Sequence, residues 1–273
     1  MNRILTIAGT EFRIARRNRW ITVSAVLMMI FALVLTAAGS APSGALAADR
    51  LSVVVASLTS LAVYVVPLIA LLLSFDAIAG EVERGTLSLL LTYPVSRAEA
   101  LAGKLLAHIA VLTLALLAGY GLAALVALVG DRSAIAGLPA LWRLGWSSVL
   151  LGITFLGAGY ALSSLAGRPS GAAGLAIALW VGAVVLYDLA LLAAVVADDG
   201  GALTQQGLPV ALLANPADAF RLFNLSASQA TAAASGLGAA AKTVPALATL
   251  GSLAIWPVLA FALAWLRFRK VQP

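Results

Sequence analysis

The sequence has no cysteine, a single histidine and very little charge for its length. Without cysteine it has neither a disulfide framework nor a thiolate metal site, and one histidine and three methionines leave few other soft metal ligands. Only 10% of the 273 residues are charged, whereas soluble domains contain about a quarter. Because 62% of the residues are hydrophobic, the composition excludes a soluble globular domain and indicates a membrane protein.

Six apolar segments are long enough to cross a membrane as helices. A helix needs about 20 apolar residues to span about 30 Å of hydrocarbon. An unpaired strand would leave its backbone groups unsatisfied in lipid, so each segment is predicted to be helical. The sequence therefore predicts an all-α membrane protein with a transmembrane domain over residues 20–270. The expected spans are residues 20–39, 52–75, 101–129, 146–166, 171–197 and 246–266.

The distribution of Lys and Arg predicts which side of the membrane is cytoplasmic. Six spans place both termini on one side, and cytoplasmic loops carry the excess of Lys and Arg. Twelve of the seventeen Lys and Arg residues fall on the side of the termini and of residues 75–104, and five fall on the other side. Both termini are therefore expected in the cytoplasm. Since topology accounts for the net charge of +6, we expect a lipid environment and no nucleic-acid partner.

Residues 1–19 are expected to form an amphipathic helix on the cytoplasmic surface of the membrane. In "RILTIAGTEFRIARR" (3–17), apolar residues share one helical face, and Arg16 and Arg17 lie on the polar face. Glu11 falls inside the apolar face. Its carboxylate either pairs with a cation or reaches water, or it contacts a cytosolic partner.

Seven charged residues are concentrated between Phe75 and Lys104, in a chain that is apolar on both sides. Within this stretch "GEVERGTLSLLL" (80–91) predicts a short helix that Gly85 interrupts. The apolar side of this helix is formed by Leu87, Leu90 and Leu91, at i, i+3 and i+4.

The end of the same stretch carries its own signals. Pro94 disfavours helix at Tyr93, and Ser96 with Glu99 forms an S-x-x-E capping box that begins the next span. Residues 76–100 therefore form a charged helical elbow, longer than two antiparallel helices need. Such an elbow suits a cytosolic partner, and the alternative is a solvated loop with an incidental helix.

Residues 198–245 form a long segment on the opposite side of the membrane. Asn215 is suited to cap a short helix, with Pro216 in its first turn. Aromatic residues and Arg often carry interface energy, so this helix either binds an extracytoplasmic partner or anchors in the outer headgroups. The expected contact residues are Asn215, Asp218, Phe220, Arg221 and Phe223.

Two polar residues inside the predicted spans are weighed as candidates for function. A carboxylate at a helix centre costs about 2.5–3.5 kcal/mol on insertion scales, so Asp188 is a candidate for function. It either reaches interfacial water or bonds to a neighbouring helix, or it belongs to a transport path or an outer gate. His108 has no second ligand at metal-binding spacing, so it is either a packed polar residue or an isolated ligand, and no metal site is expected.

The stretch "GEVERGTLSLLLTYPVSR" (80–97) resembles the cytoplasmic signature of ABC-2-type transporter permeases. In that family the segment is the coupling helix that meets the ATPase. The resemblance implies a type V exporter-like fold with two copies of the permease and two copies of a cytosolic ATPase, which binds ATP and Mg. This chain is then expected to hold no catalytic residue, cofactor or metal. The residues implied to contact or shape the ATPase interface are Asp76, Gly80, Glu81, Glu83, Arg84, Gly85, Thr86, Leu90, Tyr93, Pro94 and Arg97.

Two further stretches, "YDLALLA" (187–193) and "NPADAFRLFNLS" (215–226), resemble the ABC-2 permeases that serve the maturation of nitrous oxide reductase. This resemblance implies a bacterial inner-membrane location and a periplasmic partner protein. It also implies a role in supplying a sulfur species, or an assembly step, for the copper–sulfur site of that enzyme. The alternatives are an ABC-2 permease that exports a drug, peptide or lipid, and an intramembrane enzyme or scaffold.

Overall fold

The computed structural model describes residues 3–16, 26, 29–30, 33–34, 50–130, 132–226 and 244–272. Within these ranges every regular element is helical, as expected for a chain that must satisfy its backbone groups in lipid. The expected first span, residues 20–39, lies outside the described residues except at five positions, and Arg17 and residues 227–243 also lie outside them.

Five of the expected spans are present as helices long and apolar enough to cross a membrane. They are α3 (Arg50–Ser74), α6 (Arg97–Gly130), α7 (Leu138–Ala166), the continuous run of α8, η2 and α9 (Pro169–Asp198), and α14 (Ala246–Phe268). The helix α7 begins at Leu138 rather than at residue 146, because Pro139 fits the first turn of a helix, where its missing N–H group is not needed.

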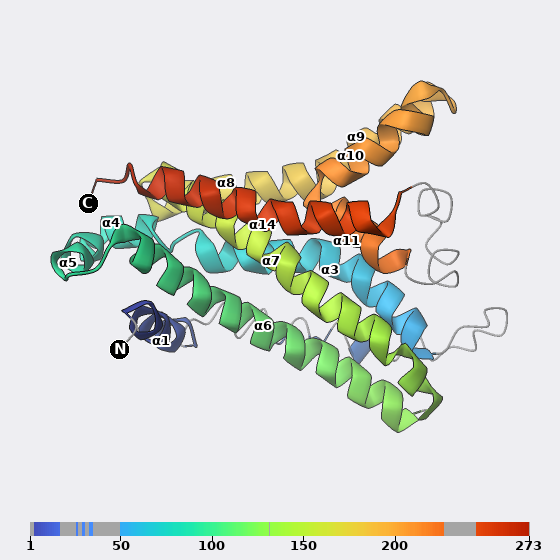
Figure 1. The fold of residues 1–273 in the computed structure, drawn as a ribbon, viewed down its shortest axis with the longest axis horizontal. Helices are drawn as coiled ribbons and strands as arrows, with labels where there is room; N and C mark the ends of the chain where they lie inside the picture. Colours follow the sequence, from blue (N-terminus) through green and yellow to red (C-terminus); the bar gives the residue numbers. More distant parts are fainter. Residues whose placement is uncertain are drawn as a thin grey trace.

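The helix α7 runs through the middle of the described bundle and packs against α3, α6 and α14 (Figure 1). Its buried side carries large core residues, among them Phe155 and Tyr160. Gly157 allows α14 to approach closely, because a Cβ atom at this position would lie 2.9 Å from the backbone of Ala260. The core therefore lies between α7 and these three neighbours.

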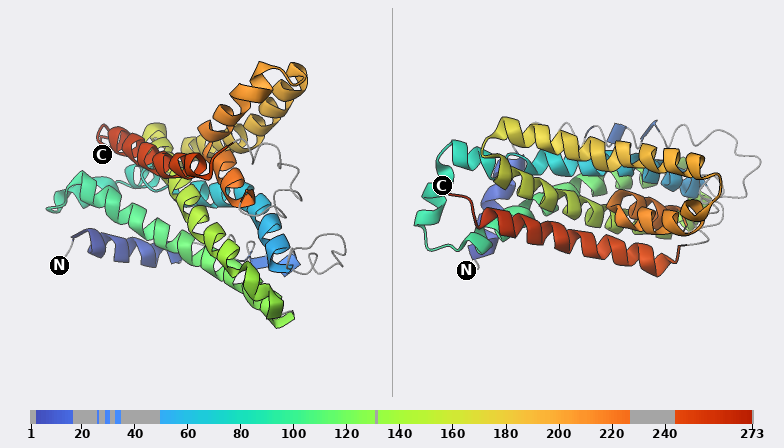
Figure 2. Two further views of the ribbon diagram at one scale, coloured as in Figure 1. Left: turned by 45° about the vertical axis from the view of Figure 1, so that its right-hand side comes forward. Right: turned by 90° about the horizontal axis from the view of Figure 1, so that it is seen from above.

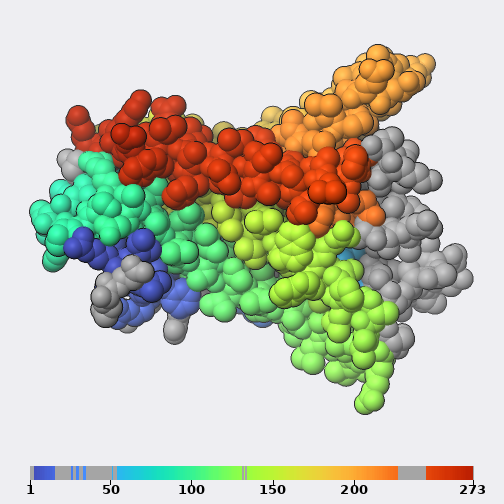
Figure 3. All heavy atoms as spheres, viewed as in Figure 1, coloured from blue at the N-terminus to red at the C-terminus, as the bar shows by residue number. Residues whose placement is uncertain are grey.

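The fifth span is bent within its length. The helix α8 (Pro169–Trp180) passes into the π-helical turn η2 (Val181–Leu186) and then into α9 (Tyr187–Asp198). After η3 (Leu203–Gly207), α10 (Leu208–Ala214) returns beside α9, and neither α9 nor α10 contains a buried residue. Figures 1 and 2 show α9 and α10 projecting from the bundle, and they stand clear of it in Figure 3.

The two ends of the molecule carry different short elements. At one end lie α1 (Arg3–Arg16), α4 (Ala79–Glu83), α5 (Thr86–Thr92) and the C-terminus (Figures 1 and 2). We call it the elbow end; it is the end that the distribution of Lys and Arg predicts to be cytoplasmic. At the opposite end lie the 3-10 helix η1 (Arg132–Gly137) and α11 (Pro216–Leu225).

Candidate functional site

The local structure of the elbow follows its sequence. The two short helices α4 and α5 are separated at Gly85, which adopts a left-handed conformation with φ +67° that favours glycine. The predicted capping box is confirmed: the Ser96 N–H group donates to the Glu99 carboxylate at 2.8 Å, and the Glu99 N–H group donates to Ser96 Oγ at 3.2 Å. Glycine and capping chemistry therefore set the two corners of the elbow.

Two hydrogen bonds fix the first part of the elbow to the helix α7. The Oγ atom of Ser163, near the end of α7, accepts hydrogen bonds from the N–H groups of Ile78 and Ala79 at 3.0 and 2.9 Å. These two groups would otherwise be orphaned at the start of α4. Sequence reasoning missed Ser163, because nothing in the pattern of α7 points to a partner 84 or 85 residues away.

Gly80 is required by the side chain of Asp76. A Cβ atom on Gly80 would lie 2.1 Å from Asp76 Oδ1, so a larger residue would displace this carboxylate. The other oxygen, Oδ2, pairs with Arg84 at 3.5 Å, and each side chain is about half exposed to solvent. An exposed pair of this kind contributes at most about 1 kcal/mol. Asp76 and Arg84 therefore shape the elbow surface more than they stabilise it.

A buried lysine joins three elements at the elbow end. Lys104 of α6 donates to Glu11 Oε1 of α1 at 2.6 Å and to Glu81 Oε1 of α4 at 2.5 Å, and its side chain is only 3% exposed. The pairing explains why Glu11 lies in the apolar face of α1. Glu81 faces inward as well, although the family resemblance implied that it contacts or shapes the ATPase interface.

The predicted amphipathic helix is present as α1, and it packs against α6. Gly103 permits the approach, since a Cβ atom there would lie 2.7 Å from Ile7 Cγ2. Arg13 is exposed, whereas the side chain of Arg16 lies outside the described part of the structure. The apolar face of α1 is therefore covered in part by the third span.

Arg97 connects the elbow to the C-terminal helix. Its Nη1 atom donates to the carbonyl oxygens of Phe268 and Val271 at 3.0 and 2.7 Å, and its guanidinium lies over the Phe268 ring. The last carbonyl groups of a helix lack internal partners and attract cations. Arg97 therefore satisfies the end of α14.

The outward surface of the elbow is formed by residues of α4, α5 and the turn that follows. Leu87 is fully buried and Leu90 half-buried, which confirms an apolar side that faces the protein. Leu89 and Tyr93 remain exposed, at 61% and 62%. Among the implied interface residues, those that are exposed are Glu83, Arg84, Gly85, Thr86, Tyr93 and Pro94. The elbow therefore presents two large apolar side chains among charged and small ones.

At the opposite end, α11 has the predicted cap but not the predicted exposure. Asn215 Oδ1 accepts from the Ala217 N–H group at 2.9 Å, and Pro216 lies in the first turn, so the cap is confirmed. The expectation that Phe220 and Phe223 face a partner or the headgroups is wrong for this structure, because both are buried, with Phe220 at 0%. They are buried because α11 folds back against α3, α7 and α14.

Asp188 and Arg221 form an ion pair between the fifth span and α11. Arg221 Nη2 donates to Asp188 Oδ2 at 2.7 Å, and Arg221 Nη1 donates to Asp218 Oδ1 at 3.2 Å. The structure thus favours the interpretation of Asp188 as a carboxylate bonded to a neighbouring helix. Burial, helped by the neighbouring Asp188, raises the pKa of Asp218 from 3.8 to about 7, and Arg221 opposes this shift.

His108 is bonded within the core. Its Nδ1 atom lies 2.8 Å from the hydroxyl oxygen of Tyr160, in a buried contact between α6 and α7. This agrees with the interpretation of His108 as a packed polar residue. No group of three or more potential metal ligands occurs among the described residues.

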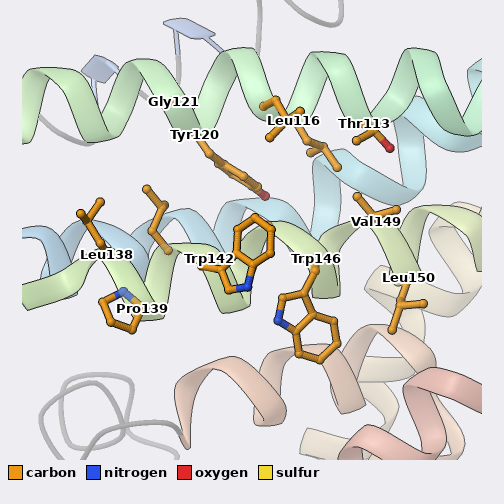
Figure 4. A pocket seen from close by; sticks show the side chains of 13 residues that line it. Thr113, Leu116, Tyr120, Gly121, Leu138, Pro139, Trp142, Trp146, Val149 and Leu150 are labelled. Atoms are coloured by element: carbon orange, nitrogen blue, oxygen red, sulfur yellow. The ribbon is translucent and has the colours of Figure 1, made fainter.

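An apolar cavity of about 940 Å³ lies between α6 and α7 (Figure 4). Tyr120, Trp142 and Trp146 line it, and the Tyr120 hydroxyl pairs with Ser148 Oγ at 2.9 Å. Trp142 is exposed, so the cavity opens towards the surface of the bundle. Nothing in the sequence pattern predicted this cavity.

The fold and the elbow agree with a known family of transporter subunits. The sequence profile described as "ABC-2 family transporter protein" matches residues 5–272, so the chain belongs to this family. It is therefore a multi-pass membrane permease of an ABC transporter and not an enzyme. This confirms the resemblance drawn from residues 80–97.

Two relatives match almost the whole chain. A protein of Pseudomonas aeruginosa, "Probable ABC transporter permease protein NosY", is 46% identical over 271 residues, which are 98% of each chain. A protein of Stutzerimonas stutzeri with the same description is 41% identical over an alignment of 277 positions, which covers 99% of each chain. The chain is thus similar along its full length to permeases named NosY, as the stretches at 187–193 and 215–226 indicated.

Proposed function

We propose that this chain receives the movement of a separate cytosolic ATPase through the elbow and passes it to its membrane helices. The observation that carries the proposal is the combination of an exposed surface around Leu89 and Tyr93 with attachments that hold the elbow to the body. These attachments run through Lys104 to α1 and α6, through Ser163 to α7, and through Arg97 to α14. A push on the elbow would therefore reach several helices together.

The proposed assembly contains two copies of this chain and two copies of a NosF-like ATPase, which holds ATP and Mg. The excess of Lys and Arg at the elbow end supports an orientation with this end and both termini in the cytoplasm of a bacterial inner membrane. Family membership supports the ATPase partner, because an ABC permease works with an ATPase.

The proposed role is the maturation of the copper–sulfur site of nitrous oxide reductase, together with a NosD-like periplasmic protein. The similarity to permeases named NosY supports this role. A sulfur species, or mechanical force passed to the periplasmic partner, suits the chain better than copper as cargo. Cu(I) prefers thiolate and thioether ligands, and the chain has no cysteine and three methionines.

The elbow proposal is tested with the purified complex of this chain and its ATPase in nanodiscs. The variant carries Leu89→Ser and Tyr93→Ala, which remove the two large apolar side chains from the elbow surface. Truncation of a central interface residue commonly costs 2 kcal/mol or more, so we expect binding of the ATPase to weaken about 30-fold. The matched control is Val210→Ala, an exposed apolar residue of α10 far from the elbow. Unchanged co-purification and unchanged ATP hydrolysis in the elbow variant would contradict the proposal.

A further inference from the structure

The helix α11 is held among the spans by polar contacts on several sides. The Asn215 amide donates to the carbonyl oxygen of Ala183, in the π-helical turn η2, at 2.6 Å. Asn224 of the same helix donates to Ser147 Oγ of α7 at 2.9 Å. Each of these bonds requires one particular position of α11 relative to its neighbour. Together they fix α11 against the bend of the fifth span and against α7.

We call the contact between α11 and the fifth span the joint. Its charged residues, Asp188, Asp218 and Arg221, do not balance in charge. Arg221 is a single cation between two carboxylates, Asp188 of α9 and Asp218 of its own helix. Asp218 is only 1% exposed, and its Oδ2 atom is buried without a hydrogen-bond donor among the described residues. A buried carboxylate oxygen without a donor is unfavourable. Among the described residues, the joint therefore lacks one positive charge and one donor.

The other ionisable groups that the structure describes near the joint do not supply them. Tyr187 precedes Asp188 in α9, and Tyr64 of α3 lies within electrostatic range of Arg221. Arg143 of α7 stacks over the Phe223 ring, and no ion pair joins it to either carboxylate in the described structure. The segment Leu208–Ala214 and the part of α14 before Arg267 contain no ionisable residue. One proton would provide both the missing charge and the missing donor.

We propose that Asp218 and Asp188 form a proton-binding site that latches α11 to the bent fifth span. A proton on Asp218 Oδ2 is donated in a hydrogen bond to the Asp188 carboxylate, while Arg221 bridges the two acids. When this proton leaves, two carboxylates with one guanidinium remain in a buried site and repel each other. The latch is then weakened.

The pH range in which the latch loses its proton follows from the burial of Asp218. Burial raises its pKa from 3.8 to about 7 in the folded chain. Between these two values the folded state keeps a proton that the unfolded chain has lost, so stability falls as pH rises through this range. The latch is therefore closed while Asp218 holds its proton and is weakened when a rise in pH removes it.

Infrared difference spectroscopy of the full-length chain in nanodiscs tests the protonation directly. We expect the carbonyl band of a protonated carboxylic acid to be lost as the pH rises from about 5.5 to about 8.5. Asp218→Asn should lack this pH-dependent band. Asp199→Asn, which alters an exposed aspartate near the same end, is the matched control and should retain it. The same band in wild type and Asp218→Asn, or titration only near pH 4, would overturn the proposal.

The pH dependence of thermal unfolding tests the latch itself. We expect a lower midpoint at pH of about 8.5 than at about 5.5 in the wild type, and loss of this difference in Asp218→Asn. If that variant does not fold, Asp188→Asn replaces it. Removal of the neighbouring charge should then shift the infrared transition to lower pH, and an unshifted transition contradicts the proposal. Neither readout requires the ATPase, so failure here is distinct from failure of the proposed function.

Discussion

At the scale of single residues, the elbow end depends on one buried cation. Lys104 meets two carboxylates that lie 93 and 23 positions away in the sequence. The pairs differ from exposed ion pairs, because the ammonium group is almost fully buried and removal of one partner leaves charges without compensation. Lys104 is therefore a positioning residue for both α1 and α4.

Lys104→Met is expected to loosen both helices. Breaking a buried ion pair commonly costs about 3–5 kcal/mol, and the partial exposure of Glu11 and Glu81 places the loss at or below the lower end of that range. We therefore expect a lower unfolding midpoint and faster hydrogen exchange of residues 3–16 and 79–92. Lys270→Met, at an exposed lysine of the same end, is the control and should have little effect. Unchanged exchange in both helices would contradict the role of Lys104.

At the scale of elements, α11 separates local from tertiary information. The sequence predicts where α11 begins, because an asparagine cap followed by proline favours the start of a helix in any surroundings. The sequence does not predict that α11 is buried. Two phenylalanines at i, i+3 suit a membrane surface, a partner or the core of the same chain equally well. Only packing against α3, α7 and α14 decided this point.

Phe220→Ala is expected to destabilise the chain rather than release a partner. Truncation of a fully buried Phe commonly costs about 3–5 kcal/mol, through lost apolar burial and the cavity that remains. The measurement is the unfolding midpoint of the chain without any partner, compared with Val210→Ala at an exposed position of α10. A stable Phe220→Ala chain that loses a periplasmic partner would restore the original interpretation of an interface.

At the scale of the whole molecule, the ion pairs of the described residues lie towards its two ends, and few potential soft metal ligands lie between them. His108 is engaged by Tyr160, and the candidate ligands of the spans are otherwise Met28 and Met29. A relay of copper sites across about 30 Å of hydrocarbon would need several sets of soft ligands. The composition of this chain does not supply them.

We expect no ATP-dependent copper transport by the complex. Inverted vesicles that contain this chain with its ATPase should take up no more copper with ATP than with a non-hydrolysable analogue. His108→Ala should not change this result. Copper uptake that requires ATP and disappears in His108→Ala would show that the inference from ligand chemistry is wrong.

The sequence by itself determined that the chain is a membrane protein, and it predicted the five spans that the structure describes. It also predicted the elbow with its break at Gly85 and its capping box, and the amphipathic first helix. These features depend on apolar length, periodicity and local hydrogen bonds, which neighbouring residues specify. Tertiary structure alone decided that Lys104 pairs with Glu11 and Glu81, that Asp188 meets Arg221, and that α11 is buried. These contacts join residues far apart in the chain, and no periodicity records which helices will be neighbours. The sequence showed that Glu11 and Asp188 lie in apolar surroundings and left pairing as one of several alternatives, and the fold supplied the cations.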